Sequence, residues 1–340
     1  TTTSSSSAGS EPESIKSIKY NAPLDYASQG RCVTSEDYKV YAKKLYPNAQ
    51  SVQVFGGESG SFDSSLGVVS TAEYGKVFIS IKSTTGLDLT SQEKTQLVTD
   101  LAPYTIASTT PVIVDPLTVS LILNTNFKFD SSATTLTSEG IKNAITNALL
   151  AYNSSDLGKF DGIFRHSKVT GVIDDADTSI LGNITNVTMG QFFTPTTTAS
   201  TAYTFFFNNA FYNPHSGHNA SSGGVIASTG FYISGDSTNE RFFDDNGEGG
   251  LRTYYLSSGT RIYDSASAGT VTYSTGKIVT SGIYIASVGL VDGAASSRIR
   301  ITAIPDSKDV VPVRNQILEI DFTNSTITGG VDTIAVSDSS

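Results

Sequence analysis

Cysteine is almost absent from this 340-residue sequence, in which Cys32 is the only one. A single cysteine excludes an intramolecular disulfide framework and any zinc site built on several cysteines. Cys32 stands next to Val33, and we expect it to be a small buried apolar residue. A chain of this length buries enough core to fold without a disulfide or a metal.

Charged residues are scarce, at 16% of the chain, and the 22 Lys and Arg are outnumbered by 32 Asp and Glu. The net charge is −10, and Lys and Arg form no cluster. This argues against nucleic-acid binding, because phosphate recognition requires concentrated positive charge. Apolar runs of about eighteen residues, the length that crosses a membrane, are missing, as is an N-terminal hydrophobic signal region. The sequence therefore predicts neither a nucleic-acid nor a membrane partner.

What the chain does contain is typical of turn-rich β structure: 16 Tyr, 17 Phe and 30 Gly, with abundant Ser and Thr. The pattern predicts an α+β multidomain fold, with two small α/β sandwich units followed by an all-β, sandwich-like C-terminal domain. The expected divisions are a disordered or linker segment over residues 1–19, an α+β domain over 20–110, a small α/β domain of ferredoxin-like type over 111–190, and a β-rich domain over 191–340.

Local signals place the elements. Thr34 with Asp37, and Thr90 with Glu93, predict capped helices that end before Pro47 and Pro103. A further helix is predicted over 138–151 and another around 160–164, and strands are predicted over 76–82, 117–129, 168–173 and 184–189. Asp245-Asn246-Gly247 predicts a hairpin turn between strands 241–244 and 251–256.

The segment from Asn21 to Glu58 combines an Ala-Pro turn, a capped helix, a proline stop and a strand that ends in two glycines. Its motif residues are Ala22, Pro23, Arg31, Thr34, Asp37, Tyr38, Pro47, Gly56, Gly57 and Glu58. In this order and spacing the segment resembles the opening motif of the baseplate J-like family, the wedge proteins of contractile phage tails. A second block, residues 305–321, is similar to the C-terminal end of long baseplate wedge proteins of T-even-like myophages.

The resemblance implies a structural subunit of the virion, assembled in the host cytoplasm and located in the inner ring of the tail baseplate. It implies contacts with a second copy, with other wedge proteins, and with hub and sheath-proximal proteins, and a part in assembly and in the triggering of contraction. It also implies that the chain is the C-terminal portion of a longer protein. Within the motif, Arg31 is expected to form a buried or semi-buried ion pair with Glu58 or Asp37.

Three clusters of polar residues are candidates for chemical sites. His215 and His218 lack the helix that would align them on a metal, because Pro214 and Gly217 stand beside them. The acidic residues around Asp174 could act as catalytic acids or cation ligands, but we interpret them as turn residues, because aspartate side chains bond to nearby backbone amides where a strand turns.

The acidic run that follows Phe243 lacks the ligand spacing of a calcium loop. We therefore predict no catalytic residue, no metal and no cofactor.

An aromatic cluster is the best candidate for a subunit interface, or else it forms the core of the β-rich domain: Phe205, Phe206, Phe207, Phe211 and Tyr212. The β-rich C-terminal domain is the expected region of self-association. Two other functions remain open. A receptor- or glycan-binding tail protein is favoured by the Tyr, Asn and Thr content of the C-terminal half. A tail-associated glycan hydrolase would use Asp174 or Asp175.

Overall fold

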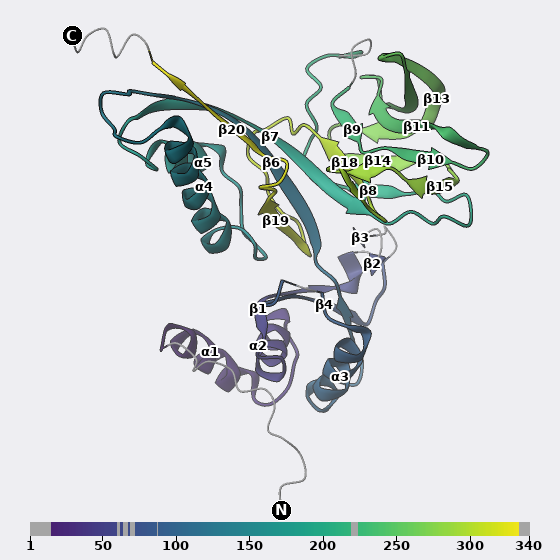
Figure 1. Cartoon of the computed structure of the whole chain (residues 1–340). Coiled ribbons are helices and arrows are strands. Elements are labelled where there is room, and N and C mark those ends of the chain that lie inside the picture. Colours follow the sequence, from purple (N-terminus) through teal and green to yellow (C-terminus); the bar gives the residue numbers. More distant parts are fainter. Residues whose placement is uncertain are drawn as a thin grey trace, which may run out of the picture. The chain divides into compact units, whose positions relative to one another are not determined.

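The computed structural model describes residues 15–59, 62–63, 67–68, 72–86, 88–218 and 224–332. The chain divides into two compact units: unit 1 is Thr1–Ser64 with Val68–Leu117, and unit 2 is Ser65–Gly67 with Thr118–Ser340. Both contain helices and strands (Figure 1), which confirms the predicted α+β multidomain class. Of the predicted N-terminal linker, residues 1–14 lie outside the described residues, and helix α1 (Ile15–Ser28) begins before its predicted end.

Unit 1 is built on a three-stranded sheet of order β1-β4-β5. Strand β1 (Ala49–Gly56) is antiparallel to β4 (Lys76–Ser83), and β4 is parallel to β5 (Thr110–Val114). Parallel neighbours need a crossover, and α3 (Ser91–Leu101) supplies it. The short elements along this part of the chain are η1 (Gly57–Ser59), β2 (Phe62–Asp63), β3 (Gly67–Val68) and η2 (Ala102–Tyr104).

Both predicted capping boxes of unit 1 are present. Helix α2 (Ser35–Leu45) begins after Thr34 and α3 begins after Thr90, and each cap exchanges hydrogen bonds with the acidic residue three positions on. The apolar faces of these helices and of the sheet form one core. Its buried members are Cys32, Tyr38, Tyr41, Ala42, Val52, Val54, Ile79, Ile81, Leu89, Leu97 and Leu101.

Unit 2 begins with two long antiparallel strands, β6 (Leu117–Phe129) and β7 (Ile180–Phe193). The chain between them forms α4 (Ser138–Ser155) and α5 (His166–Asp174), whose apolar stripes pack into the same core as the strands. In a ferredoxin-like unit the strands that flank a helix are parallel, so this order differs from the expected one. The last strands, β19 (Gln316–Ile320) and β20 (Thr326–Val331), return to β6.

The rest of unit 2 continues the same sheet as a strongly curled β region (Figure 1), in the order β7-β18-β9-β11-β12-β13-β14-β8. Its strands are β8 (Thr204–Phe206), β9 (Ile226–Ser228), β10 (Phe231–Ile233), β11 (Asp236–Asp245), β12 (Gly250–Ser257), β13 (Thr260–Thr272), β14 (Lys277–Thr280), β15 (Ile285–Val288) and β18 (Ile299–Ala303), with β16 (Leu290–Val291) and β17 (Ala294–Ala295) as a separate ribbon.

Two buried glutamines connect the ends of this curled region. The side-chain amides of Gln191, on β7, and Gln316, on β19, each donate a hydrogen bond of 2.8 Å to the carbonyl oxygen of Phe206 on β8. The backbone of an end strand, which would otherwise face the interior unpaired, is thereby satisfied.

Three local predictions are wrong. Pro23 lies inside α1, so the Ala-Pro turn is part of a helix. Residues 168–173 lie in α5 and form helix, not strand, because Val169 and Ile173 make a buried stripe at a spacing of four. The helix predicted around 160–164 is absent from this described stretch, where Asp161 has a φ of +67° and Phe164 pairs with Val310.

The predicted hairpin is confirmed, since β11 and β12 pair across residues 246–249. Its turn works differently from the Asn-Gly type expected. Asn246 is outside the set of residues with positive φ, and its side-chain oxygen instead accepts hydrogen bonds from the backbone of Glu248 and Gly250. The division of the chain at residues 110 and 190 stays a prediction; the second of these positions falls within β7.

Candidate interaction site

The motif residues of unit 1 cap helix α2 and hold it against the sheet. Thr34 accepts a hydrogen bond from the backbone N–H of Asp37, and the Asp37 carboxylate accepts from the backbone of Thr34 and Val33 at 2.8 and 3.1 Å. Tyr38 is buried, and its hydroxyl is 3.0 Å from that of Thr109. Pro47 follows the end of α2, as expected for a helix stop.

Burial and hydrogen bonding shift the pKa of the Asp37 carboxyl group in opposite directions. Partial burial raises the pKa of its carboxyl group, but the hydrogen bonds from Thr34 and Val33 outweigh it, and the net pKa lies below the usual value. The neighbouring thiol is different. Burial, with a smaller contribution from the charge of Asp37, raises the pKa of Cys32 to about 12. This keeps the thiol protonated and unreactive at neutral pH.

We expect Asp37→Ala to destabilise unit 1 by about 1 kcal/mol at neutral pH, because the helix loses its capping box. Since the folded-state pKa of Asp37 is lowered, its stabilisation is present above the unfolded-state value of 3.8 and is lost as the pH falls through the folded value. Urea unfolding of wild type and variant at pH 6 and at pH 3 checks this. The matched control is Glu36→Ala, and a wild-type–variant difference equal at both pH values would contradict the assignment.

Arg31 does not take the position expected for it. Its side chain is exposed, and the ion pairs among the described residues include none from Arg31 to Asp37 or Glu58. The Asp37 carboxylate is already occupied by backbone donors of the helix cap. An exposed guanidinium at the start of a structural motif remains available to a neighbouring molecule.

The two glycines of the motif have different surroundings. A Cβ atom on Gly57 would lie 2.0 Å from the backbone oxygen of Glu73, whose own N–H donates to the Gly57 carbonyl at 2.8 Å. A Cβ atom on Gly56 would meet only the carboxylate of Glu58, at 1.9 Å, which can swing away. Only Gly57 is therefore required by a close backbone crossing.

Gly57→Ala is expected to destabilise unit 1 by about 1–3 kcal/mol, since backbone must move to make room for the methyl group. Gly56→Ala is expected to cost less, because a flexible exposed side chain absorbs the clash. Thermal unfolding of the two variants beside wild type checks the order. Equal effects, or the reverse order, would show that the crossing at Glu73 does not constrain the motif.

The predicted aromatic cluster separates into two groups. Phe205, Phe207 and Phe211 are 4%, 0% and 2% exposed and belong to the core of unit 2. For these three residues the burial supports the core alternative and not the interface, because their side chains pack inside unit 2. Phe206 is half-buried beneath the ammonium group of Lys277, and Tyr212 is 39% exposed. An interface role stays a prediction for these two side chains.

The acidic candidates are engaged in local structure. Asp174 accepts a hydrogen bond from the side chain of Asn183, and Asp175 ends helix α5. Asp177 accepts from the backbone and hydroxyl of Ser179, and these bonds lower the pKa of its carboxyl group. This is the behaviour of turn-stabilising aspartates.

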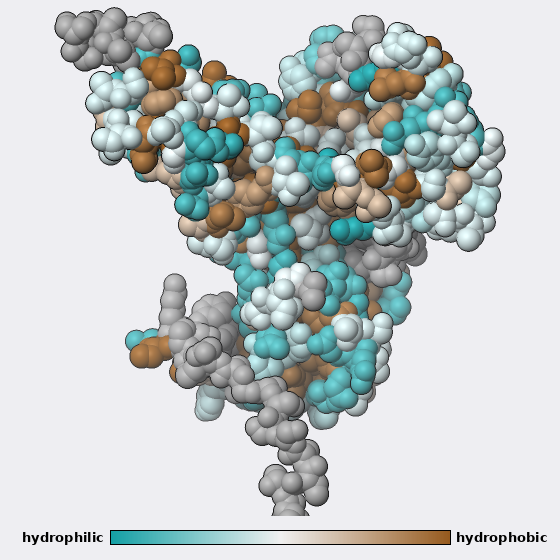
Figure 2. Space-filling view, in the orientation of Figure 1, coloured by the Kyte–Doolittle hydropathy of each residue, from teal (hydrophilic) through white to brown (hydrophobic). Residues whose placement is uncertain are grey.

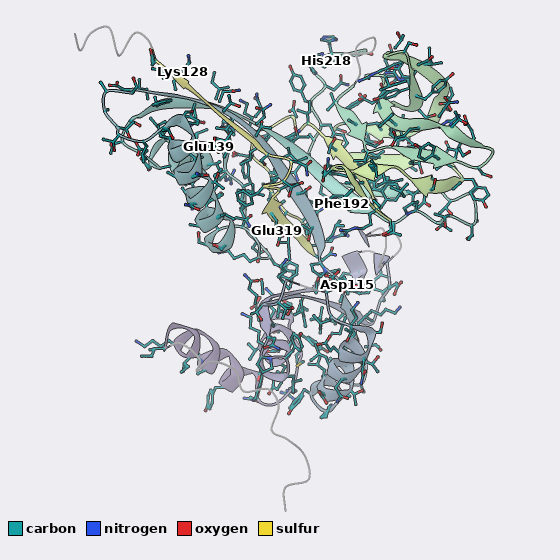
Figure 3. All side chains as sticks on the ribbon, viewed as in Figure 1. Asp115, Lys128, Glu139, Phe192, His218 and Glu319 are labelled. Atoms are coloured by element: carbon teal, nitrogen blue, oxygen red, sulfur yellow. The ribbon has the colours of Figure 1, made fainter. Side chains whose placement is uncertain are left out.

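His218 lies at the periphery of unit 2 (Figure 3), and its Nδ1 is 3.2 Å from Nε2 of His215. Within the described part of the chain, groups of three or more His, Cys, Asp or Glu side chains that could hold a metal ion are absent. Of the described helices, none has the length and hydropathy needed to span a membrane.

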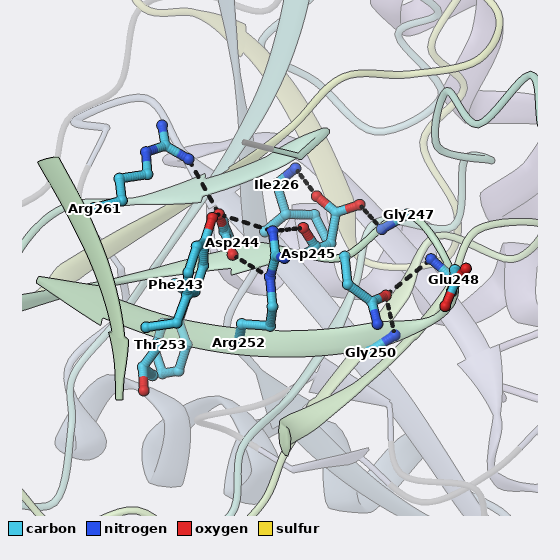
Figure 4. A network of polar contacts seen from close by, with 12 residues as sticks. Ile226, Phe243, Asp244, Asp245, Gly247, Glu248, Gly250, Arg252, Thr253 and Arg261 are labelled. Atoms are coloured by element: carbon cyan, nitrogen blue, oxygen red, sulfur yellow. Dashed lines mark hydrogen bonds and ion pairs between the residues drawn. The ribbon is translucent and has the colours of Figure 1, made fainter. Parts of the chain in front are cut away.

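A dense polar network, which the sequence did not reveal, crosses strands β11, β12 and β13 (Figure 4). The Asp244 carboxylate, 2% exposed, accepts hydrogen bonds from two nitrogens of Arg252 at 3.0 and 3.2 Å and from Arg261 at 3.1 Å. It also accepts from the Tyr263 hydroxyl at 2.8 Å. The acidic run thus anchors a sheet face.

The side chain of the adjacent Asp245 points to the opposite face of the sheet from that of Asp244. Its carboxylate, on a residue that is fully buried, accepts from the backbone N–H groups of Ile226 and Gly247 and from the Tyr273 hydroxyl. Burial and the hydrogen bond to this carboxylate raise the pKa of Tyr273. Asp245 thereby fixes the turn that follows β11.

Aromatic rings lie across the same three strands. Phe242 stacks on Tyr254, with centroids 5.5 Å apart, and Tyr254 is 5.8 Å from Tyr263. The guanidinium groups of Arg252 and Arg261 lie over Tyr263 and Tyr254, at 4.2 and 4.5 Å. We call the set Phe242, Asp244, Arg252, Tyr254, Arg261 and Tyr263 the aromatic-arginine face. Its sequence signal is the alternation of Tyr and Arg in two strands joined by Ser258-Gly259.

Two protein-family profiles match the chain. Residues 34–114 match the baseplate structural protein gp6, C-terminal domain I, and residues 119–191 match its C-terminal domain III. Both profiles describe a structural protein of the tail baseplate, so the resemblance found in the sequence is confirmed.

Among known proteins, the chain is similar to baseplate wedge protein gp6 of Enterobacteria phage T4, with 27% identity over 184 residues. The match covers 53% of this chain and 26% of that protein, so the chain spans about a quarter of the relative's length. Among solved structures, a chain of the six-fold symmetrised cryo-EM structure of the anti-feeding prophage baseplate aligns with a TM-score of 0.38 and 11% identity, covering 52% of this chain and 37% of that one.

Proposed function

We propose that the chain is a baseplate wedge subunit of a contractile tail, that it contributes to the inner baseplate ring, and that it takes part in assembly and in the triggering of contraction. The observation that carries the proposal is the pair of consecutive matches to gp6 domains, one on unit 1 and one on the first part of unit 2. Its partners are a second copy, other wedge proteins, and hub and sheath-proximal baseplate proteins.

The surface of the protein supports a structural role. On the face shown in Figure 2, apolar residues form small patches among neutral and hydrophilic ones. Several large apolar side chains are nevertheless exposed in unit 2, among them Leu181, Ile184, Leu256 and Leu290, at 53%, 68%, 54% and 64%. Exposed side chains of this size suit contacts that neighbouring subunits cover.

The candidate chemical groups also favour a structural role. Asp174 and Asp177 are bound to local amide and hydroxyl donors, and Asp244 is neutralised by two guanidinium groups. A glycosidase needs one carboxyl group kept protonated in an apolar pocket beside an ionised one. Carboxylates engaged in this way are suited to holding turns and strands in place.

Deletion of the gene from the virus that encodes the chain tests the proposal. We expect particles without complete contractile tails, and wild-type protein supplied in trans should restore tails that contain the chain. An Asp174→Asn/Asp175→Asn variant should restore them equally, because these carboxylates have no catalytic part. Complete, contracting tails in the absence of the chain would refute the wedge role, and failure of the double variant alone would favour the hydrolase.

A further inference from the structure

The first half of β13 is an open sheet edge. Strand β13 pairs with β12 from Thr260 onward, but with β14 only over Gly269–Thr272. Among the described strands, none pairs with residues 260–267 on the side away from β12. Proteins usually shorten, charge or cover such an edge, because its free N–H and C=O groups can bind another strand.

The turn before β13 determines which backbone groups face outward. Ser258 and Gly259 have φ values of +50° and +81°, as in the two-residue turn of a tight hairpin. In such a turn the two flanking residues, here Ser257 and Thr260, form a hydrogen-bonded pair. Hydrogen-bonded and non-hydrogen-bonded pairs then alternate along the ladder. The N–H and C=O groups of Ile262 consequently point toward β12, while those of Arg261 and Tyr263 point away from it.

The side chains at this edge are large and accessible. Ile262 and Tyr263 are 39% and 37% exposed, and the Arg261 side chain is 36% exposed. Arg261 and Tyr263 lie on the aromatic-arginine face, and Ile262 lies on the opposite face. The Arg261 guanidinium is held over Tyr254 and against Asp244, so its methylene stem is presented at the edge.

We propose that this edge pairs, antiparallel, with the same edge of a second copy of the chain, about a two-fold axis at Ile262; this rests on the proposed function, which brings copies together. Residues that face each other across such an axis lie on the same side of the joined sheet. The axis at Ile262 therefore places Arg261 opposite the partner's Tyr263, and Tyr263 opposite the partner's Arg261.

The alternative axes fit less well. An axis at Arg261 would place two guanidinium groups directly opposite each other, and like charges there are destabilising. An axis at Tyr263 would bring the bulge at Asp264 into the pairing. Tyr263 pairs with Tyr254 and Ser265 pairs with Thr253, so Asp264 is the extra residue of β13 at this point. With the axis at Ile262, the outward groups of Arg261 and Tyr263 exchange hydrogen bonds with their counterparts, and the tyrosine rings cover the arginine stems.

The pairing involves about three residues from each chain, 261–263, so it buries less than the roughly 1,600 Å² of a standard stable interface. The isolated chain should therefore dimerise weakly and reversibly. In an assembly that holds two copies side by side, the high effective concentration would populate the pair.

Disulfide trapping detects such a weak pair. The facing Ile262 positions form a non-hydrogen-bonded pair, with Cβ atoms about 4.5–5.5 Å apart, close enough for a small shift to bring them to disulfide distance. Cys32 is fully buried and has a pKa of about 12, so it does not compete. We expect purified Ile262→Cys to form a disulfide-linked dimer under mild oxidation, several-fold faster than the control.

The matched control is Leu290→Cys, on β16, at a position that is 64% exposed and away from this edge. Circular dichroism must show both variants folded. Equal trapping of the two, or no trapping of folded Ile262→Cys, overturns the proposal. The same variant oxidised inside purified tails separates the two hypotheses: a chain present in tails but not cross-linked there or in solution refutes the edge pairing alone, whereas a chain that cross-links but is absent from tails refutes the wedge role.

Discussion

Phe207→Ala should lower the free energy of unfolding of unit 2 by about 3–5 kcal/mol, the usual cost of truncating a buried phenylalanine. Phe207 is 0% exposed and lies edge-to-face with Phe211, at a centroid distance of 5.4 Å. Denaturant unfolding followed by circular dichroism measures the loss. The expected change is a lower midpoint with an unchanged slope.

Tyr212→Ala is the matched control for this prediction. Tyr212 is five residues further along the chain and is 39% exposed, so its truncation should change the unfolding free energy of the isolated chain by less than about 1 kcal/mol. If the aromatic cluster served assembly and not the fold, Phe207→Ala would leave the isolated chain stable and reduce only its incorporation into tails. That outcome would contradict the burial of Phe207.

The elements that the sequence predicted well are those with a complete local signal. Helices α2 and α3 have a cap, an acidic residue three positions on and a proline stop, and each of these signals acts on the nearest end of the helix. Strand β6 alternates buried and exposed residues along its second half, a pattern that a half-buried strand requires. Local sequence rules are sufficient to predict an element whose stabilising contacts are made between residues close together in the sequence.

The secondary-structure predictions were wrong where contacts between residues distant in sequence determine the local conformation. Residues 168–173 contain β-branched residues, which favour a strand, but burial of Val169 and Ile173 in the core shared with β7 outweighs this local preference. Positive φ at Asp161 and the pairing of Phe164 with Val310 could not be read from a short window. Tertiary contacts routinely override such weak local preferences.

The polar network was missed for a related reason. Asp244, Arg252 and Arg261 are far enough apart in sequence that only the register of β11, β12 and β13 brings them together. Register depends on the turns at both ends of β12 and on the bulge at Asp264. The motif of unit 1 was found because its residues are contiguous, whereas the aromatic-arginine face consists of every second residue of three strands.

Asp244→Ala should destabilise unit 2 by about 3–5 kcal/mol, because it leaves guanidinium groups without their carboxylate in a shielded position. The side chain of Arg252 is 12% exposed and that of Asp244 is 2% exposed, so water cannot replace the lost partner. Thermal and denaturant unfolding measure the loss. The same variant should also loosen the β12–β13 hairpin, which amide hydrogen exchange around Tyr263 would detect.

Asp309→Ala provides the matched control for Asp244→Ala. Asp309 is paired with Arg165 at 2.8 Å and accepts from the backbone N–H of His166 at 2.9 Å, but the Asp309 and Arg165 side chains are 35% and 53% exposed, so its loss should cost only about 1 kcal/mol. Adding Arg252→Met to Asp244→Ala should recover part of the stability, since removing a buried charge with its partner is less costly than removing the partner alone. Equal effects of Asp244→Ala and Asp309→Ala would mean that the network is solvated, and the aromatic-arginine face would then have to be held together by ring packing.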